Sequence, residues 1–205
     1  MKLGVRESKV AHWGAIELAA LLALGIGLAC FAEASWIRGK AFVAQLLIAR
    51  AWGQAQNGVP APKPWPWADT TPIAKLELPL HAPGNEQPEL MVLDGASGRN
   101  LAFGPTHDPA SVRPGMRGNS VIEGHRDTHF RALEQVRVGD RLRIQGVDRR
   151  WVSFVVVDVR AVDSRRFRIA LDADAPRLTL VTCYPFDAIV PGGPLRWVVT
   201  ADARQ

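Results

Sequence analysis

The amino-terminal part of the chain carries one long apolar run. Residues 14–32 read GAIELAALLALGIGLACFA, nineteen residues in which Glu17 is the only charged side chain. A helix of about 20 apolar residues crosses the hydrocarbon core of a bilayer, and Glu17 lies about one turn from its start, where a carboxylate reaches the interface. Basic residues predominate before the run, which favours a cytoplasmic amino terminus and an exported carboxy-terminal domain. We predict a cytoplasmic tail and a transmembrane helix over residues 1–34.

Two other interpretations of this run stay open. Ala32-Glu33-Ala34 resembles a signal-peptidase site that follows an apolar run with basic residues ahead of it, so the segment could be a cleaved signal peptide. The run is long for such a peptide, which favours a retained anchor. Acylation of Cys30, as in a lipoprotein, has a poor local sequence match.

The next segment predicts a helix followed by a spacer. Apolar residues recur at helical spacing over 35–52, a stretch too short to cross the bilayer again, which favours a helix on the membrane surface or in a stalk. Five prolines follow between residues 60 and 72, and alternating proline favours an extended, semi-rigid segment. Trp65 and Trp67 would lie at the interface or pack on the domain. We assign residues 35–69 to a juxtamembrane helix and a proline-rich spacer.

Beyond residue 70 the pattern changes to short β-rich runs separated by turn residues such as Gly192-Gly193. Continuous apolar character in 151–159 predicts a strand buried on both faces, and one brief helix is predicted over 128–136 with Asp127 as its N-cap. This pattern predicts an all-β domain over residues 70–205, either a closed barrel or a sandwich. The seven strands are predicted at 73–78, 89–93, 120–123, 141–144, 151–159, 177–183 and 195–200.

Composition and charge exclude several classes of protein. Of the 205 residues, 47% are hydrophobic and 22% charged, which excludes a disordered chain. Two cysteines exclude a disulfide-dense scaffold, and no CxxC pair suggests a zinc site. Residues 1–66 hold 7 Lys and Arg against 3 acidic residues, which leaves 18 against 17 in the remainder. The larger part is almost neutral, so it lacks the clustered positive charge of a nucleic-acid-binding domain.

Cysteine usage points to Cys183. If Cys30 lies in the bilayer, Cys183 is the single cysteine of the exported domain, in a compartment that tends to oxidise thiols. An unpaired cysteine there is either buried and inert or retained for its chemistry. Cys183 ends the apolar run LTLVTC, and Tyr184-Pro185 after it must leave the strand ladder. A side chain at a strand end beside a loop is well placed for a site on a rigid frame.

Two further residues occupy similar positions. His125 follows the run VIEG at the end of a strand, and Arg196 begins the last strand after the turn PGGP. A nearby imidazolium stabilises a thiolate, and the same histidine can protonate a leaving amine and later deprotonate an attacking one. An arginine near the carbonyl oxygen would donate hydrogen bonds to the oxyanion, where loss of a donor costs about 10²–10³ in rate. We expect Cys183, His125 and Arg196 to converge on one face of a barrel.

Each of these assignments has a simpler alternative. A single histidine is usually a solvated or hydrogen-bonded loop residue, and His129 is as eligible as His125. Their spacing would suit two metal ligands on a helix, but no third ligand is evident, so we predict no metal site. Arg126 and Asp127 are expected to fix the loop, and spacing alone does not single out Arg196.

Three segments together resemble one known family. TLVTC at 179–183 resembles the nucleophile strand of sortases, which are membrane-anchored cysteine transpeptidases. GHRDTHF at 124–130 resembles their catalytic-histidine segment, and PGGPLRWVV at 191–199 their arginine strand. The order His, Cys, Arg and the intervals of 58 and 13 residues suit that family over residues 70–201. The three segments are most similar to the sortases of Gram-negative bacteria.

The resemblance implies a fold and a reaction. The fold would be a sortase-like closed β-barrel of eight strands with short helices, the missed strand lying near residues 101–103. His125 would be the acid/base, Cys183 the nucleophile and Arg196 the residue that binds the oxyanion or positions the substrate. Cys183 would cleave an LPxTG-like sorting motif of an exported protein, forming a thioester that an amine of an envelope component resolves.

The resemblance also extends to substrate binding and location. Residues 164–171 occupy the place of a loop that helps to form the substrate groove in sortases, where Arg165, Arg166 and Arg168 would read an acidic motif residue or simply form a solvated loop. Thr182, next to the nucleophile, is a further candidate for substrate contact. Asp172 and Asp174 are too few ligands for the calcium site of some sortases, and no cofactor is expected. We expect a single-pass protein of the cytoplasmic (inner) membrane with its catalytic domain on the extracytoplasmic side.

Three rival functions differ in what they require. A membrane-anchored cysteine peptidase would form the same thioester and use water as the acceptor. An L,D-transpeptidase also uses Cys and His, but its arginine follows the cysteine closely, whereas Tyr184-Pro185-Phe186 follows here. A non-catalytic anchored β-domain would have a buried Cys183 with neither His125 nor Arg196 close to it.

Overall fold

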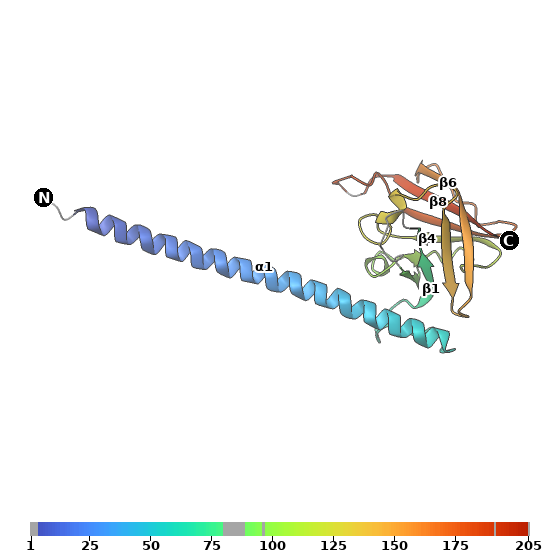
Figure 1. Cartoon of the computed structure of the whole chain (residues 1–205), viewed down its shortest axis with the longest axis horizontal. Helices are drawn as coiled ribbons and strands as arrows, with labels where there is room; N and C mark the ends of the chain where they lie inside the picture. Colours follow the sequence, from blue (N-terminus) through green and yellow to red (C-terminus); the bar gives the residue numbers. More distant parts are fainter. Residues whose placement is uncertain (1–3, 80–88, 96, 191, 205) are drawn as a thin grey trace. The chain divides into compact units, whose positions relative to one another are not determined.

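Figure 1 shows a computed structural model of the chain, which describes residues 4–79, 89–95, 97–190 and 192–204. The chain divides into two compact units, Met1–Val43 and Ala44–Gln205. The described part of the first unit is helical. The second contains the end of the same helix, the proline-rich segment and a β-barrel.

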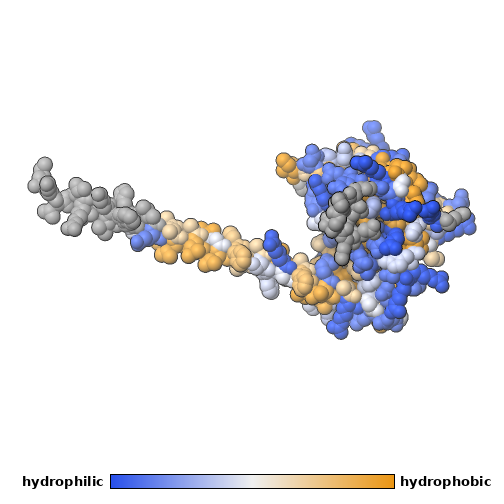
Figure 2. All heavy atoms as spheres, in the orientation of Figure 1, coloured by the Kyte–Doolittle hydropathy of each residue, from blue (hydrophilic) through white to orange (hydrophobic). Residues whose placement is uncertain are grey.

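A single helix, α1 (Gly4–Gln56), replaces the two helices expected in the amino-terminal part. The charged residues between the apolar segments, such as Glu33, Arg38 and Lys40, are compatible with a helix, and no proline interrupts the chain before Pro60. Side chains from residue 17 to residue 43 are exposed, and apolar colour predominates over much of this stretch in Figure 2. The segment Glu17–Gln56 is long and apolar enough to cross a membrane.

The proline-rich segment packs within the second unit, so it differs from an extended spacer. Pro62 and Pro64 are buried, and the ring of Trp65 meets that of Phe103 edge-on at 5.0 Å between centroids. From α1, Gln45 donates a hydrogen bond to the Phe103 carbonyl at 2.8 Å. The side chain of Trp67 remains 81% exposed. Burial of these side chains within the second unit therefore outweighs the intrinsic preference of alternating prolines for an extended chain.

Eight strands form a closed barrel in the order β1-β2-β3-β4-β7-β8-β6-β5, which confirms the expected fold. The pairs β2–β3 and β4–β7 are parallel, and the other neighbours are antiparallel. The missed strand is β3, a two-residue element that is too short to give a sequence pattern, and the expected location at 101–103 instead holds the 3₁₀ turn η1 (Asn100–Ala102). The strands are β1 (Pro72–Glu77), β2 (Glu89–Asp94), β3 (Thr106–His107), β4 (Gly118–Glu123), β5 (Arg141–Gly146), β6 (Trp151–Asp163), β7 (Pro176–Cys183) and β8 (Leu195–Ala203).

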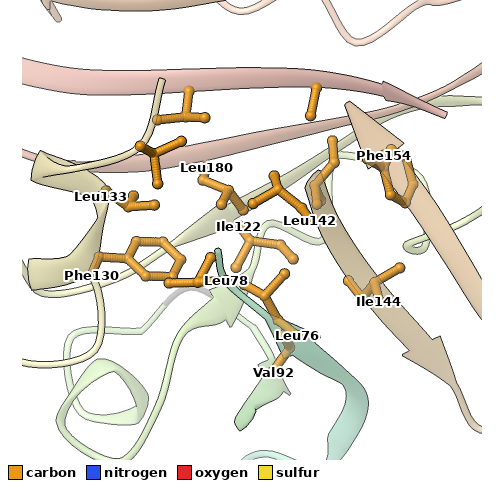
Figure 3. Packing of buried hydrophobic residues seen from close by; sticks show 14 of the residues in the cluster. Leu76, Leu78, Val92, Ile122, Phe130, Leu133, Leu142, Ile144, Phe154 and Leu180 are labelled. Atoms are coloured by element: carbon orange, nitrogen blue, oxygen red, sulfur yellow. The ribbon is translucent and has the colours of Figure 1, made fainter. Parts of the chain in front are cut away.

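Alternate residues of the strands fill the barrel. Figure 3 shows Leu76, Ile122, Leu142 and Leu180 from different strands meeting in this core, with Phe130 at its edge. Two expectations about this region are wrong. In β6 only one face is buried, because Val157 points outward and is 46% exposed. The helix expected over 128–136 is a single 3₁₀ turn, η2 (Arg131–Glu134), which begins after Phe130 without a side-chain cap, since the Asp127 carboxylate is paired with Arg126 instead.

A second, smaller apolar cluster lies on the outer face of β4, β7 and β8. It contains Val121, Val181 and Val198, against which Ile169 and Leu171 of the β6–β7 loop pack. Asn119 fastens this loop to β4, because its backbone N–H donates to the Leu171 carbonyl and its side-chain amide to the Ala170 carbonyl, both at 2.8 Å. The outer face of β4, β7 and β8 therefore carries an apolar surface, and the β6–β7 loop is fixed against it.

Candidate active site

The strand register brings Cys183 and Arg196 together. In the antiparallel pair β7–β8, Cys183 lies directly opposite Arg196, as Val181 lies opposite Val198. Opposite residues of a ladder point to the same face, with Cβ atoms about 4.5–5.5 Å apart. Cys183 and Arg196 therefore share the outer face with the apolar cluster, at the end where β7 stops and β8 starts. Cys183 is half-buried there and has no disulfide partner within the described chain.

His125 follows the strand on the other side of β7. In the parallel pair β4–β7, Glu123 is aligned with Val181, and the Gly124 N–H donates to the Val181 carbonyl at 3.1 Å. His125 is two residues beyond the last aligned residue of β4, as Cys183 is beyond Val181 on β7, so the two backbones would lie about 4.8 Å apart if the register continued past the end of β4. His125 is exposed. Cys183 is therefore opposite Arg196 on β8 and next to the segment that follows β4, in which His125 lies; the convergence of all three side chains stays a prediction.

A tight turn fixes the backbone of His125. The N–H of Phe130 donates to the His125 carbonyl at 3.0 Å, and that of Thr128 does so at 3.4 Å. The ring of Phe130 is completely buried beneath the turn. A Cβ atom on Gly124 would lie 2.6 Å from this ring. Glycine is therefore required at position 124 for the turn to pack against the buried Phe130 ring.

Arg126 ties this turn to the segment that follows the cysteine. Its side chain is buried, and its guanidinium donates to the carbonyls of Pro185 at 2.6 Å and Ala188 at 2.9 Å. It also forms a two-bond ion pair with the Asp127 carboxylate, and this hydrogen bonding raises the pKa of Arg126 and lowers that of Asp127. Arg126 and Asp127 thus hold the loops on both sides of the site together, which agrees with the expected structural role.

Arg196 is anchored but retains free donors. Its Nη1 donates to the carbonyls of Gly193 at 2.7 Å and Leu195 at 2.8 Å. Its Nε and Nη2 donate no hydrogen bond to any residue that the structure describes. A half-buried guanidinium held on one side, with donors left on the other, can bind an oxygen next to Cys183.

The electrostatics of the site involve two more titratable groups. Burial lowers the pKa of His129, and the nearby His125 lowers it further, so His129 is held towards its neutral form. Burial raises the pKa of Glu123, Asp108 adds to this effect, and Arg196 opposes it. Glu123 could not be identified from the sequence, because only the strand register reveals that it shares a face with Cys183.

The four residues expected to bind substrate differ in how exposed their side chains are and in whether other residues already bind them. Thr182 is 2% exposed and points into the opposite face from Cys183, where its hydroxyl donates to the Gly124 carbonyl at 2.7 Å. It holds β4 against β7 and is not accessible to a substrate on the outer face. Arg165 pairs with Asp163 through side-chain and backbone hydrogen bonds that lower the pKa of this acid to about 2. Arg168 donates to the carbonyls of Ser164 and Phe167, whereas the side chain of Arg166 is exposed and forms no hydrogen bond or ion pair within the described chain.

The outer face also carries a hollow of about 380 Å³ under the β6–β7 loop. Arg160, Phe167 and Arg168 line it, together with Thr179 and Val198 on the strands below. Cys183, His125 and Arg196 are not among its lining residues, so the hollow is separate from the candidate catalytic residues. Among the residues the structure describes, no group of three or more His, Cys, Asp or Glu side chains is arranged to hold a metal ion.

Comparison with known proteins identifies the family. The model of the sortase domain matches residues 81–204. Sortase D of Bacillus subtilis (strain 168) is 32% identical over 112 residues, which cover 54% of this chain and 56% of the relative, so the chain spans about half the length of that curated protein.

Solved structures support the same assignment of the fold. Sortase A from Corynebacterium diphtheriae superposes with a TM-score of 0.58 at 23% identity, covering 68% of this chain and 63% of that one. A Clostridium perfringens sortase D5 transpeptidase superposes with a TM-score of 0.55 at 21% identity, covering 66% and 80%. The closer similarity to sortases of Gram-negative bacteria stays a prediction. The match of the family model to more than half of the chain, together with the barrel, shows that this chain belongs to the sortase family.

Proposed function

We propose that this chain is a cysteine transpeptidase in which Cys183 is the nucleophile, His125 the acid/base and Arg196 the oxyanion-binding residue. The observation that most supports the proposal is the β7–β8 register, in which Cys183 is directly opposite Arg196. The alignment of β4 with β7 as far as Gly124, the residue before His125, supports the role of the histidine. The membership of the chain in the sortase family supports the same roles.

The first half of the reaction is an acyl transfer to sulfur. The Cys183 thiolate attacks the carbonyl carbon between Thr and Gly of an LPxTG-like motif, forming a C–S bond and an oxyanion. Arg196 donates hydrogen bonds to that oxyanion, a contribution of about 10²–10³ in rate for one donor. Collapse of the intermediate breaks the C–N bond, and His125 gives its proton to the leaving amine.

The second half transfers the acyl group to an amine. An amine of an envelope component attacks the thioester carbonyl, and His125 takes the proton that this nitrogen loses. The C–S bond breaks, the sulfur leaves as a thiolate, and a new amide bond forms. The exposure of His125 supports both proton transfers, because leaving and entering amines can reach it from solvent.

We further propose that α1 anchors the protein in the cytoplasmic membrane as a single span, with the barrel on the extracytoplasmic side. The long apolar helix supports an anchor. The substrates would then be exported proteins with a sorting motif near the carboxy terminus, and the acceptor an amine of the envelope. Of the arginines in the β6–β7 loop, Arg166 is the most available to an acidic substrate residue.

Mass spectrometry of the full chain in detergent with an LPxTG-type peptide tests this proposal. We expect an adduct of the amino-terminal peptide fragment on Cys183, which an added amine releases as an amide product. Cys183→Ala should form no adduct, whereas Cys30→Ala should form it normally. Release only as the free acid, even at high amine concentration, would favour a peptidase, and a wild-type level of cleavage in Cys183→Ala would refute the nucleophile.

A further inference from the structure

The outer face of the barrel that carries Cys183 and Arg196 also carries an acidic side chain with no assigned role. Glu123 on β4 is aligned with Val181 on β7, two residues before Cys183. Residues two apart on a strand point to the same face. Glu123 therefore faces the outer side of the barrel, one step along the strands from the proposed catalytic group, and it is half-buried there.

The carboxylate of Glu123 lacks a hydrogen-bonding or ionic partner among the described residues. No hydrogen bond or ion pair joins Glu123 to another residue in the part of the chain that the structure describes. Two charged groups act on Glu123 from a distance: Asp108, which accepts a hydrogen bond from the Ala110 N–H at 2.9 Å, and Arg196, whose Nη1 donates to the carbonyls of Gly193 and Leu195. The Glu123 carboxylate is thus available to interact with a ligand bound on the outer face of the barrel.

A structural role does not account for a carboxylate at this position. The neighbours of Glu123 on this face include Val181 and Val121, and a valine or threonine would pack against them without a desolvation cost. Burial indeed raises the pKa of Glu123, which shows that its charged form is disfavoured by its surroundings. A half-buried carboxylate that the fold neither pairs nor needs, next to a nucleophile, is typical of a residue that acts on a ligand.

We propose that Glu123 is a specificity-determining residue that selects a positively charged group of the substrate, a protonated amine above all, next to Cys183. The inference rests on the proposed function for the identity of the reaction, but the electrostatic effect does not depend on turnover. Two sources can supply the charge, a basic side chain of the sorting signal or a second amine on the acceptor. A unit charge about 8 Å away, at an effective dielectric of about 60 that reflects the exposure of this face to water, changes the ratio of cation to anion attack by about tenfold.

Charged thiol reagents measure this effect directly at Cys183. The full chain carrying Cys30→Ser is treated in detergent with a cationic (trimethylammonium) and an anionic (sulfonate) methanethiosulfonate, and the two rates of Cys183 modification are compared. We expect Glu123→Gln to lower the cation-to-anion rate ratio about tenfold and Glu123→Lys to lower it further. Glu89→Gln is the matched control, because this carboxylate on β2 is half-exposed and paired with Lys75; its ratio should equal that of the wild type.

The pH dependence of the same ratio identifies the group responsible. The charged or titratable groups that act on Glu123 are Asp108 and Arg196, with His125 and Cys183 next along the wall. Because the pKa of Glu123 is raised, the cation preference should decline as the pH falls towards that pKa, and the part of the decline that Glu123→Gln removes belongs to this carboxylate. The thiolate fraction affects both reagents equally and cancels in the ratio. An unchanged ratio in Glu123→Gln, with the fold intact by circular dichroism, would overturn the proposal.

Two further arms distinguish the sources of positive charge. For the sorting signal, acylation rates are compared for peptides with Lys or Glu at the variable motif position. For the acceptor, the resolution of the thioester is compared for a diamine and an uncharged amine of similar size. We expect Glu123→Gln to remove the preference for the cationic partner in one of these arms, and the persistence of both preferences would overturn the proposal. Absence of any thioester in the wild type would instead refute the proposed function, whatever the reagent ratio shows.

Discussion

Replacement of Gly124 by alanine perturbs the turn that holds His125. An added Cβ would lie 2.6 Å from Cδ2 and 2.7 Å from Cγ of the Phe130 ring, whereas carbon atoms pack best at about 3.5–4.0 Å. The ring is completely buried and part of the main core, so it cannot turn into solvent. Either the ring or the turn must therefore move by about 1 Å, the deficit between these distances.

The expected cost follows from overpacking. Extra carbon atoms forced into a filled core destabilise a protein by about 1–3 kcal/mol, and the rigid aromatic neighbour favours the upper part of this range. We expect Gly124→Ala to lower the free energy of unfolding by about 2–3 kcal/mol. If the turn absorbs the shift, His125 moves relative to Cys183, and a displacement of about 1 Å at a catalytic group costs about 10² in rate.

Urea unfolding of the full chain in detergent, followed by tryptophan fluorescence, measures the first effect, and peptide cleavage measures the second. Gly98→Ala is the control, since no heavy atom lies within 4 Å of its added Cβ, and it should leave stability within about 0.5 kcal/mol. Phe130→Leu should relieve the clash, so the double variant should be less destabilised than the sum of the single ones. A wild-type unfolding midpoint with wild-type activity in Gly124→Ala would refute this account of the turn.

Four other predictions test separate parts of the site. Cys183→Ala should form no thioester by mass spectrometry while keeping the wild-type circular dichroism spectrum; unfolding of this variant would mean that the thiol is needed for packing. His125→Ala should lower kcat by at least 10², and His129→Ala by less than tenfold; a similar loss in both would mean that His129 shares the catalytic role. Arg126→Gln should lower the free energy of unfolding by about 2–3 kcal/mol, because the Pro185 and Ala188 carbonyls lose a charged donor; an unchanged urea midpoint would contradict this. The native pKa of Glu123 is raised above 4.5, so the folded state binds the Glu123 proton more tightly than the unfolded state does. The wild type should therefore lose stability relative to Glu123→Gln as the pH rises above 4.5. A stability difference between the two proteins that is constant from pH 4 to pH 8 would exclude this.

The sequence predicted the barrel well where strands are long and alternate, as in β4, β7 and β8. It could not reveal β3, because two residues carry no period, nor the one-sided burial of β6, because its apolar residues lie on both faces. The charged residues near Glu33 and Lys40 look like a break between two helices, although a helix continues through them. The five prolines look like a spacer, although three of them, Pro62, Pro64 and Pro72, are buried.

Local sequence made Cys183, His125 and Arg196 candidates, because each lies at a strand end next to turn residues, but the resemblance to sortases was needed to choose His125 over His129 and Arg196 among the arginines. It was not sufficient for residues whose role depends on neighbouring strands. Thr182 looks eligible next to the cysteine, but strand alternation turns its side chain inward. Glu123 gave no local signal, and only its alignment with Val181 sets it on the same face as the nucleophile.

The central claim is that one substrate carbonyl is held between three side chains from different strands. A crystal structure of the chain with Cys183 acylated by a sorting-motif peptide analogue tests it most directly. We expect the thioester carbonyl oxygen within about 3.2 Å of an Arg196 nitrogen, and the His125 ring within hydrogen-bond reach of the position of the leaving or entering nitrogen. A sulfur atom about 10 Å or more from both the imidazole and the guanidinium, beyond the reach of any direct hydrogen bond, would contradict the account.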